Sequence, residues 1–448
     1  MTPSQILLEN ILSCLQRDLV PELQSPKAAA AAEAMARALA RMSVYAGARG
    51  EADSPAGWFS ADPALRQVHN GEQERGISTQ VTDSLRGLYH REWQALAAIE
   101  DATEKLLSDK GAAPQDPRVA SSEDTTRAKL ETYLQRKYSA PEARIIAFHH
   151  VVGGRSKQTA FFSVSGIEPL RRELVLRSDI PINLSGGKSV AYEYSLQDVL
   201  ANHGMKVPRP LLLEADASEI GQSFMVVEKL PGTVAGQYFS PPSSQALLAD
   251  YAAELARLHA VPLSAFDDLD VEINPLPRES LTAEIEQLRA VCIECGTLSL
   301  ILETAYAWLL ENIEIAYRDR PCLAHRDALF HNVLAQDDRV SAILDWELAR
   351  VSCAAEDLGY IRSTVPLAMP WETFMRHYEK AAGRTIDQDQ VDYFAILSVS
   401  RNCSMASNVR RVVVERQSQD IELTSVTLHD LYRMQYQLGE HLNRALGK

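Results

Sequence analysis

The sequence predicts an α+β fold in two to three domains, because the hydrophobic period changes twice along its 448 residues. Apolar residues first recur at helical spacing, then form short runs separated by Gly and Ser, and finally return to helical spacing. We therefore expect a helical N-terminal module over residues 1–120, a small antiparallel lobe over 125–230 and a larger, mainly helical lobe over 231–448.

The elements follow from local patterns. In the first zone, helices are expected over residues 6–19, 28–40 and 85–107, and a polar linker follows over 110–124. In the second zone, helices are expected over 130–137 and 189–202, the latter closed by Gly204. Strands are expected over residues 143–152, 159–164, 173–176, 211–213 and 224–228. The third zone should be helical to its end, apart from one strand–turn–strand passage over 333–344.

Composition excludes several classes of protein. Hydrophobic residues make up 46% and charged residues 23%, which is typical of a globular chain rather than a disordered or fibrous one. The net charge of −15 disfavours nonspecific nucleic-acid binding, so no nucleic-acid partner is expected. No segment approaches the roughly 20 apolar residues that span a bilayer, and six cysteines indicate no disulfide framework. We expect a cytoplasmic protein without a membrane partner.

The most informative stretch lies between residues 325 and 347. Twelve residues separate Asn332 from Asp345, and their pattern indicates a β-hairpin with its turn at 336–339. Because antiparallel pairing brings the two ends of a hairpin together, Asn332 and Asp345 should lie side by side. An amide oxygen next to a carboxylate is a hard-oxygen site suited to Mg²⁺ that bridges phosphates.

Asp327 lies five residues before Asn332 on the loop that enters this hairpin, so it can reach a hydroxyl aligned with the metal. The order H-x-D-x-x-x-x-N followed by a strand-borne Asp is the catalytic signature of protein-kinase-like phosphotransferases. Each residue alone is more simply a turn, loop or capping residue, but the three at these spacings favour a site. His325 should support the loop through hydrogen bonds, and His331 is interpreted as an ordinary loop residue.

With Leu344-Asp345-Trp346-Glu347 and Glu356-Asp357-Leu358-Gly359 added, the sequence resembles the aminoglycoside phosphotransferase superfamily. It is most similar to the kinase-like domains related to those linked to acyl-CoA dehydrogenases. The resemblance covers residues 125–448 and implies a protein-kinase-like two-lobed fold that follows the helical N-terminal module. It also implies ATP and Mg²⁺ as cofactors.

A Gly-Gly pair lies between the first two predicted strands, in Val152-Gly153-Gly154-Arg155-Ser156. Glycines allow backbone N–H groups to approach triphosphate oxygens, although Gly-Gly in a hairpin is usually only a turn. In register with the family, this is the phosphate-covering loop. The resemblance therefore implies that Gly153, Gly154 and Ser156 bind the nucleotide.

The strand over 173–177 ends in Arg177, where the protein-kinase pattern has a Lys that holds the α- and β-phosphates. The relatives linked to acyl-CoA dehydrogenases also have Arg here, and Arg can bind phosphate in bidentate fashion. Its partner should be a carboxylate on the next helix. Glu193 is the candidate, because Leu196 and Leu200 place it on the inward face; a solvated Glu193 is the alternative.

The strand over 224–230 resembles the segment that joins the two lobes, which implies that the backbone near Glu228 and Leu230 meets the adenine. A lone C-x-x-C, Cys292 and Cys295, indicates two packed cysteines rather than zinc.

The resemblance implies ATP-dependent phosphorylation of a small-molecule hydroxyl, in which Asp327 orients the hydroxyl or accepts its proton, and Asn332 and Asp345 hold Mg²⁺. A hydroxyacyl-CoA or a hydroxy acid is the favoured acceptor, because of the likeness to domains linked to acyl-CoA dehydrogenases. An aminoglycoside remains an alternative acceptor, and a non-catalytic nucleotide-binding regulator is the alternative of another class. The pattern predicts no oligomeric state.

Overall fold

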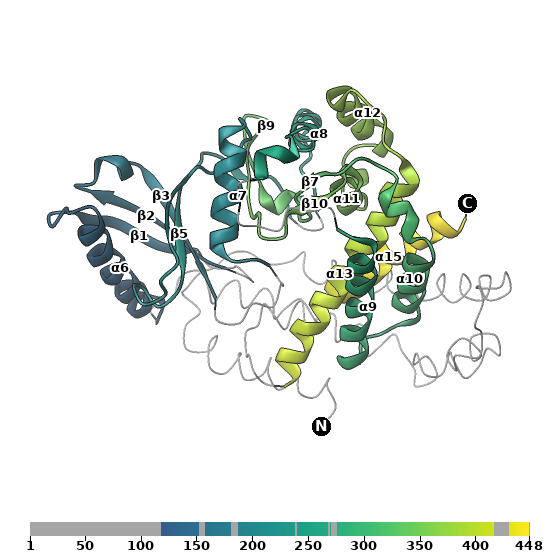
Figure 1. Cartoon of the computed structure of the whole chain (residues 1–448), viewed down its shortest axis with the longest axis horizontal. Helices are drawn as coiled ribbons and strands as arrows, with labels where there is room; N and C mark the ends of the chain where they lie inside the picture. The colour runs from purple at the N-terminus through teal and green to yellow at the C-terminus, as the bar shows by residue number, and fades with distance from the viewer. Residues whose placement is uncertain are drawn as a thin grey trace, which may run out of the picture. The chain divides into compact units, whose positions relative to one another are not determined.

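The computed structural model describes residues 118–151, 157–180, 187–237, 240–267, 269, 276–415 and 430–447 (Figure 1). The N-terminal module expected over 1–120 lies outside the described residues up to residue 117, and so do Gly153, Gly154 and Ser156. The described residues belong to two compact units. One contains Pro117–Leu281 and Asn312–Ser398, and the other contains Thr282–Glu311 and Val399–Lys448.

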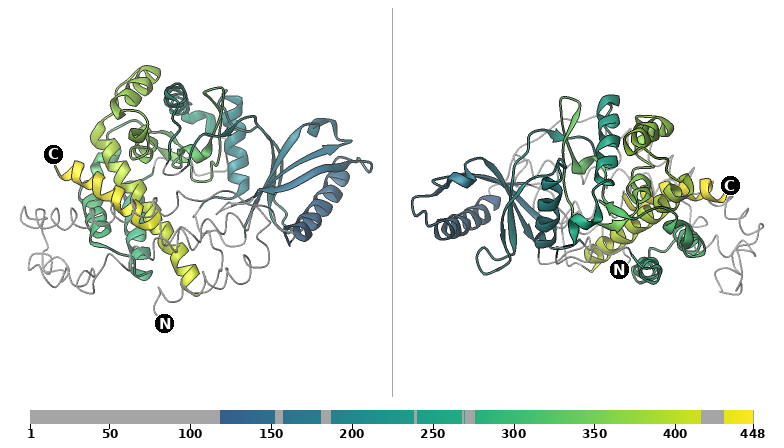
Figure 2. Two further views of the ribbon diagram at one scale, coloured as in Figure 1. Left: turned by 180° about the vertical axis from the view of Figure 1, so that it is seen from behind. Right: turned by 45° about the horizontal axis from the view of Figure 1, so that its top comes forward.

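The first unit contains a five-stranded antiparallel sheet in the order β1-β2-β3-β5-β4. Its strands are β1 (Arg144–Val151), β2 (Lys157–Ser165), β3 (Glu173–Asp179), β4 (Pro210–Glu214) and β5 (Phe224–Glu228). Figures 1 and 2 show helix α6 (Arg118–Lys137) alongside this sheet. All five strands that the sequence predicts in this zone are present.

Side chains of β3 alternate between the two faces of the sheet, as the period of a strand requires. Leu174 and Leu176 join the core that α6 covers, whereas Val175 packs with Val190 of helix α7 (Val190–Asn202). Arg177 has the same parity as Val175, so the cation at the end of β3 faces α7. The two helices thus cover opposite faces.

Helix α7 is fixed at both ends. The Ser189 hydroxyl accepts a hydrogen bond from the Tyr192 amide, and the Asp179 carboxylate at the end of β3 accepts one from the Val190 amide at 3.1 Å. After the helix, Gly204 adopts a positive φ of 74°, which a residue with a side chain rarely adopts. This confirms the helix and the glycine that were predicted to close it.

The second part of this unit is mainly helical and contains the predicted hairpin, β8 (Val333–Gln336) and β9 (Arg339–Ile343). Asp337 and Asp338 form its two-residue turn with positive φ values of 51° and 56°, as tight hairpin turns require. The sequence predicted only this strand–turn–strand passage, and that prediction was incomplete. A short strand β6 (Thr233–Val234) adds to β8, and β7 (Cys322–Ala324) pairs with β10 (Arg350–Ser352).

Helices α8 (Gln245–Leu258), α11 (Ala354–Tyr360) and α12 (Trp371–Ala382) complete this part, together with the first turns of α13 (Gln388–Val414). Gly359 of α11 lies against α13, where a Cβ atom would come within 2.6 Å of the Ala395 nitrogen. A side chain at 359 would therefore push α11 away from α13. The sheet followed by a mainly helical part is the two-lobed arrangement that the sequence predicts.

The other unit is helical in its described part. It contains most of α9 (Arg278–Glu294), helix α10 (Leu300–Glu311), the later turns of α13 and helix α15 (Leu431–Leu446). Helices α10 and α15 pack together, and the Tyr306 hydroxyl donates to the Ser400 carbonyl. No helix in the described ranges is both long and apolar enough to cross a bilayer.

Candidate active site

The β8–β9 hairpin brings Asn332 and Asp345 to its open end. Val333 pairs with Ile343, and the Leu344 amide donates to the Asn332 carbonyl at 2.8 Å. Asp345 follows directly and has a φ of 67°, in the left-handed region that non-glycine residues seldom occupy. The predicted juxtaposition of the two ends is therefore present in the structure.

Both oxygens of the Asp327 carboxylate accept hydrogen bonds. The Tyr360 hydroxyl at the end of α11 donates to Oδ1 at 2.6 Å, and the Asn332 amide donates to Oδ2 at 2.8 Å. The His331 ring nitrogen Nε2 lies 3.8 Å from the same Oδ2. The sequence interpretation missed Tyr360 and treated His331 as an ordinary loop residue, although His331 at i+4 from Asp327 was a usable signal.

Burial alone would raise the pKa of Asp327, but the contacts with His331, Tyr360 and His325 outweigh it and hold this pKa well below its ordinary value. The carboxylate is thus an anion at every pH at which the protein would normally be studied. A weakly basic, firmly held carboxylate is suited to orienting a hydroxyl.

The backbone of the Asp327 loop is held by a buried carboxylate. Asp357 of α11 accepts from the His325 amide at 2.8 Å and from the Arg326 amide at 2.7 Å. Its Oδ2 also contacts His259 Nε2 at 3.0 Å. Arg326 has a φ of 66°, so these two amide bonds support another left-handed residue directly before Asp327.

His325 connects this loop to the strand that leads to Asp345. Its Nδ1 accepts from the Asp327 amide at 3.2 Å, so the ring proton lies on Nε2, which donates to the Leu344 carbonyl at 2.8 Å. The ring also packs against the buried Trp346, with centroids 4.5 Å apart. The predicted supporting role of His325 agrees with these contacts.

Arg177 lies between two carboxylates. Its Nη2 is 3.2 Å from Glu193 Oε2 and 3.0 Å from Asp345 Oδ1. The Glu193 side chain is 0% exposed, so the alternative of a solvated Glu193 is wrong. Arg177 Nη1 has no partner among the described residues, which leaves two N–H donors for another ligand.

The charges of this pair are set by burial and by each other. Burial opposes the charge of Arg177, but Glu193 and Asp345 outweigh it and raise the pKa of Arg177, so the guanidinium stays protonated. Burial raises the pKa of Glu193 to about 7, against the opposing effects of Arg177 and the Trp346 amide.

The remaining predicted site residues lie apart from this cluster or outside the described part. The Glu228 carboxylate accepts from the Arg209 amide at 3.2 Å and contacts Arg172 at 3.4 Å. Its side chain thus contacts the residues that precede β4 and β3, at the end of β5. Leu230 follows β5, and no hydrogen bond to its backbone occurs among the described residues.

The oxygen atoms at the hairpin end fit a magnesium ion. Both hydrogen bonds of the Asn332 amide come from Nδ2, so its Oδ1 accepts none among the described residues. Asp345 Oδ2 likewise has no partner within the described ranges. Mg²⁺ prefers such oxygens and usually takes one or two protein ligands together with phosphates. No group of three or more His, Cys, Asp or Glu in the described part could hold a metal by itself.

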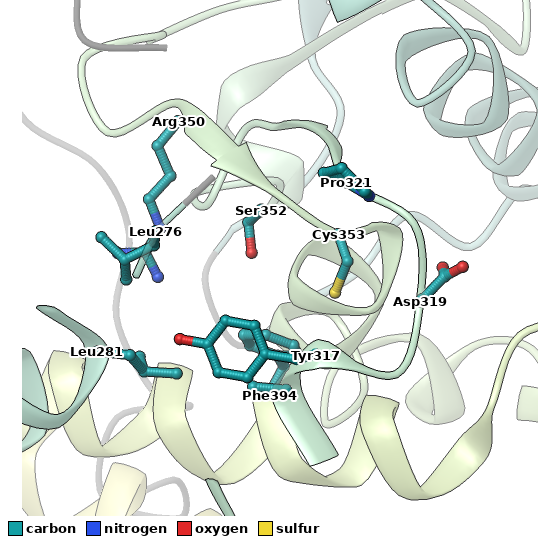
Figure 3. A pocket seen from close by; sticks show the side chains of 10 residues that line it. Leu276, Leu281, Tyr317, Asp319, Pro321, Arg350, Ser352, Cys353 and Phe394 are labelled. Carbon is teal, nitrogen blue, oxygen red and sulfur yellow. The ribbon is translucent and has the colours of Figure 1, made fainter. Parts of the chain in front are cut away.

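A separate cavity of about 190 Å³ lies beside β10 and is drawn in Figure 3. Its lining includes Tyr317, Arg350, Cys353 and Phe394, and none of the predicted site residues. Arg350 contacts Glu356 at 3.0 Å, and Glu356 also contacts Arg326.

A model of the phosphotransferase enzyme family matches residues 153–393, which is more than half of the chain. Among curated proteins, the chain is 24% identical over 356 residues to acyl-CoA dehydrogenase family member 11 of Rattus norvegicus, which covers 70% of this chain and 45% of that protein. It is 27% identical over 243 residues to acyl-CoA dehydrogenase family member 10 of Mus musculus. That match covers 52% of this chain and 21% of that protein. The chain thus spans less than half the length of these relatives.

Two solved structures share the fold. One is a Ralstonia eutropha JMP134 protein assigned as an aminoglycoside phosphotransferase, with a TM-score of 0.56, 20% identity, and 71% of this chain and 98% of that chain covered. The other is the GDP complex of a point mutant of aminoglycoside 2′-phosphotransferase IIIa, with a TM-score of 0.50 and 17% identity. The match covers 72% of this chain and 99% of that chain. At this identity the likeness establishes the kinase-like fold alone.

Proposed function

The chain belongs to the phosphotransferase enzyme family, and from this premise we propose that it transfers the γ-phosphoryl group of ATP to a hydroxyl of a small molecule. The observation that carries the proposal is the gathering of Asp327, Asn332, Asp345 and Arg177 around the open end of one hairpin. Phosphoryl transfer needs an oriented acceptor, neutralised phosphate charge and a positioned nucleotide. Asp327 would meet the first need, Asn332 and Asp345 the second through Mg²⁺, and Arg177 the third.

Asp327 orients the acceptor hydroxyl and receives its proton late in the transfer. Its low pKa makes it a poor base at the start of the reaction, but the largely dissociative transition state demands little nucleophile activation. Tyr360 and Asn332 hold the carboxylate from either side, so its direction does not depend on the substrate.

Asn332 Oδ1 and Asp345 would hold Mg²⁺, which would supply positive charge to neutralise the phosphates. Arg177 would position the α- and β-phosphates through its Nη1, while Glu193 holds the guanidinium in place. Gly153, Gly154 and Ser156 would cover the phosphates through backbone and hydroxyl donors, and the backbone near Glu228 and Leu230 would meet the adenine.

We assign a hydroxyacyl-CoA or a hydroxy acid as the acceptor. The names of the curated relatives support an acyl-CoA context, and Arg177 agrees with the pattern of the kinase-like domains linked to acyl-CoA dehydrogenases. We also propose that the protein is cytoplasmic.

The test is a screen of purified protein with ATP and Mg²⁺ against simple alcohols, hydroxyacyl-CoAs and aminoglycosides, scored by ADP release above the water background. We expect ADP release and a phosphorylated product with a hydroxyacyl-CoA or hydroxy acid. Product from aminoglycosides alone would move the acceptor to that class. ATP binding without turnover on any acceptor would favour the non-catalytic regulator.

A further inference from the structure

Three consecutive residues, Asp345, Trp346 and Glu347, are each bound by a polar side chain from the sheet or from α7. Arg177 of β3 contacts the Asp345 carboxylate at 3.0 Å. Glu193 of α7 accepts from the Trp346 amide at 3.2 Å. The Glu347 carboxylate accepts from Lys157 of β2 at 2.8 Å. The proposed function uses the first contact and leaves the third unexplained.

The Lys157 ammonium contacts three oxygen atoms of the protein. It donates to Glu347 Oε2 and to the Lys188 carbonyl, each at 2.8 Å, and lies 3.4 Å from Asp179 Oδ1. A lysine has three N–H donors, and three acceptors surround this one. The side chains of Lys157 and Glu347 are only 2% and 6% exposed. Lys157 is therefore engaged by protein oxygens, whereas Arg177 keeps its Nη1 for another ligand.

The position of the Lys157–Glu347 ion pair indicates its role. Asp345 holds a strained left-handed backbone, and such conformations persist only when the surroundings fix them firmly. Glu347 lies two residues further on, and its carbonyl accepts from the Lys188 amide at 3.0 Å, next to the start of α7. Contacts on either side of Trp346 thus hold the segment that carries the proposed metal ligand.

We infer that Lys157 and Glu347 are positioning residues, whose buried ion pair fixes the 345–347 segment so that the Asp345 carboxylate points at the nucleotide phosphates. This inference rests on the proposed function for its catalytic consequence, but not for its structural one. The pair acts through Asp345 and touches neither substrate nor metal.

The decisive variant is the apolar double substitution Lys157→Met with Glu347→Leu. Replacing a buried ion pair by apolar side chains of similar volume often preserves stability, whereas removing one partner does not. The double variant should therefore stay folded while losing the directional contact. The matched control is Arg384→Met with Asp319→Leu, which removes a partly buried pair of 2.7 Å away from the hairpin end.

Two measurements separate this inference from the proposed function. In nucleotide-free protein, hydrogen exchange of peptides that contain Trp346 and Lys188 should rise about tenfold in the double variant and stay unchanged in the control. At saturating ATP, kcat should fall by about tenfold or more and the Mg²⁺ requirement should rise, because a misplacement near 1 Å can cost about a hundredfold. A melting temperature near that of the wild type would exclude a general loss of structure.

Unchanged exchange in the double variant would overturn the inference, whatever the turnover. Wild-type protein that neither binds nor turns over ATP would instead overturn the proposed function, and exchange alone would then decide the role of the pair. If the apolar double variant does not fold, Glu347→Gln provides a second test, since it keeps the shape of the side chain but removes the negative charge that pairs with Lys157. A normal kcat and normal exchange in that folded variant would also contradict the inference.

Discussion

Arg177 of β3 contacts Asp345 at 3.0 Å, across 168 residues of sequence, and thereby joins the strand lobe to the open end of the β8–β9 hairpin. The same guanidinium contacts Glu193, so it connects the proposed metal ligand to the buried face of α7. A cation shared between two carboxylates lowers the repulsion between them. It also places positive charge where nucleotide phosphates would approach.

Because Arg177 contacts Glu193 directly, we predict that substitutions at these two residues are energetically coupled in ATP turnover. Arg177→Met and Glu193→Gln should each weaken ATP turnover, and the double variant should lose less than the sum, with a coupling of about 0.5–3 kcal/mol. The cause is that each substitution removes the same contact. A double-mutant cycle on kcat/KM for ATP measures it. The same cycle on Arg289 and Glu303, an ion pair of 2.6 Å in the other unit, should show no coupling in turnover. Additive losses at Arg177 and Glu193 would mean that their pairing is irrelevant to turnover.

The buried Glu193 predicts a pH dependence of stability. Burial raises its pKa to about 7, above the ordinary value of roughly 4.3, so the folded state binds this proton more tightly than the unfolded state. The stabilisation is complete below about pH 4.3 and is lost as the pH rises through about 7. Denaturant unfolding at several pH values should show the wild type losing about 1–3 kcal/mol relative to Glu193→Gln across this window. Parallel stability curves would contradict the prediction, and Asp198→Asn, at a partly exposed position of α7, serves as the control.

Local sequence patterns were sufficient for the elements that carry the predicted site. The apolar residues flanking a polar turn predicted the hairpin that joins Asn332 to Asp345, because strand pairing over so short a loop has few alternatives. Leu196 and Leu200 predicted the buried face of Glu193, because helix geometry fixes which residues share a face.

The features that the sequence did not predict depend on tertiary contacts, which leave no local sequence pattern. Lys157 and Glu347 are 190 positions apart, and a lysine in a strand is usually solvated, so nothing in the sequence marked them as a buried pair. Strands β7 and β10 have three residues each, too few to show an alternating period. Tyr360 contacts Asp327 from 33 positions further along the chain, which is a tertiary effect.

The left-handed backbone of Asp345 directs the choice of variant for the metal. Asp345→Asn removes the charge but keeps a residue that tolerates a positive φ, whereas alanine would add strain. We expect Asp345→Asn to lose at least about tenfold in Mg²⁺-dependent ATP affinity, because an amide is a weaker ligand for a hard cation than a carboxylate.

Calorimetry with ATP at several Mg²⁺ concentrations measures this loss of affinity. Asp338→Asn is a matched control, since it makes the same change at a positive φ in the same hairpin. Equal Mg²⁺ dependence in wild type and Asp345→Asn would remove Asp345 from the metal site.

The last prediction concerns Asp327, whose proposed role is not shared with nucleotide binding. Asp327→Asn keeps the size of the side chain and can still accept from the Tyr360 hydroxyl, but it removes the charge and places one amide group against the Asn332 amide. That contact should cost about 1–3 kcal/mol of stability, while ATP affinity stays near the wild-type value. Turnover should fall at least about a hundredfold, which is the lower range for losing acid–base assistance. Because contacts with His331 and Tyr360 hold the pKa of Asp327 well below its ordinary value, wild-type kcat should show no titration of this group above about pH 5.

Thermal unfolding, ATP calorimetry and kcat, measured on the same preparation, decide the assignment together. Loss of ATP binding would indicate that Asp327 is structural, and normal turnover would exclude it from the chemistry.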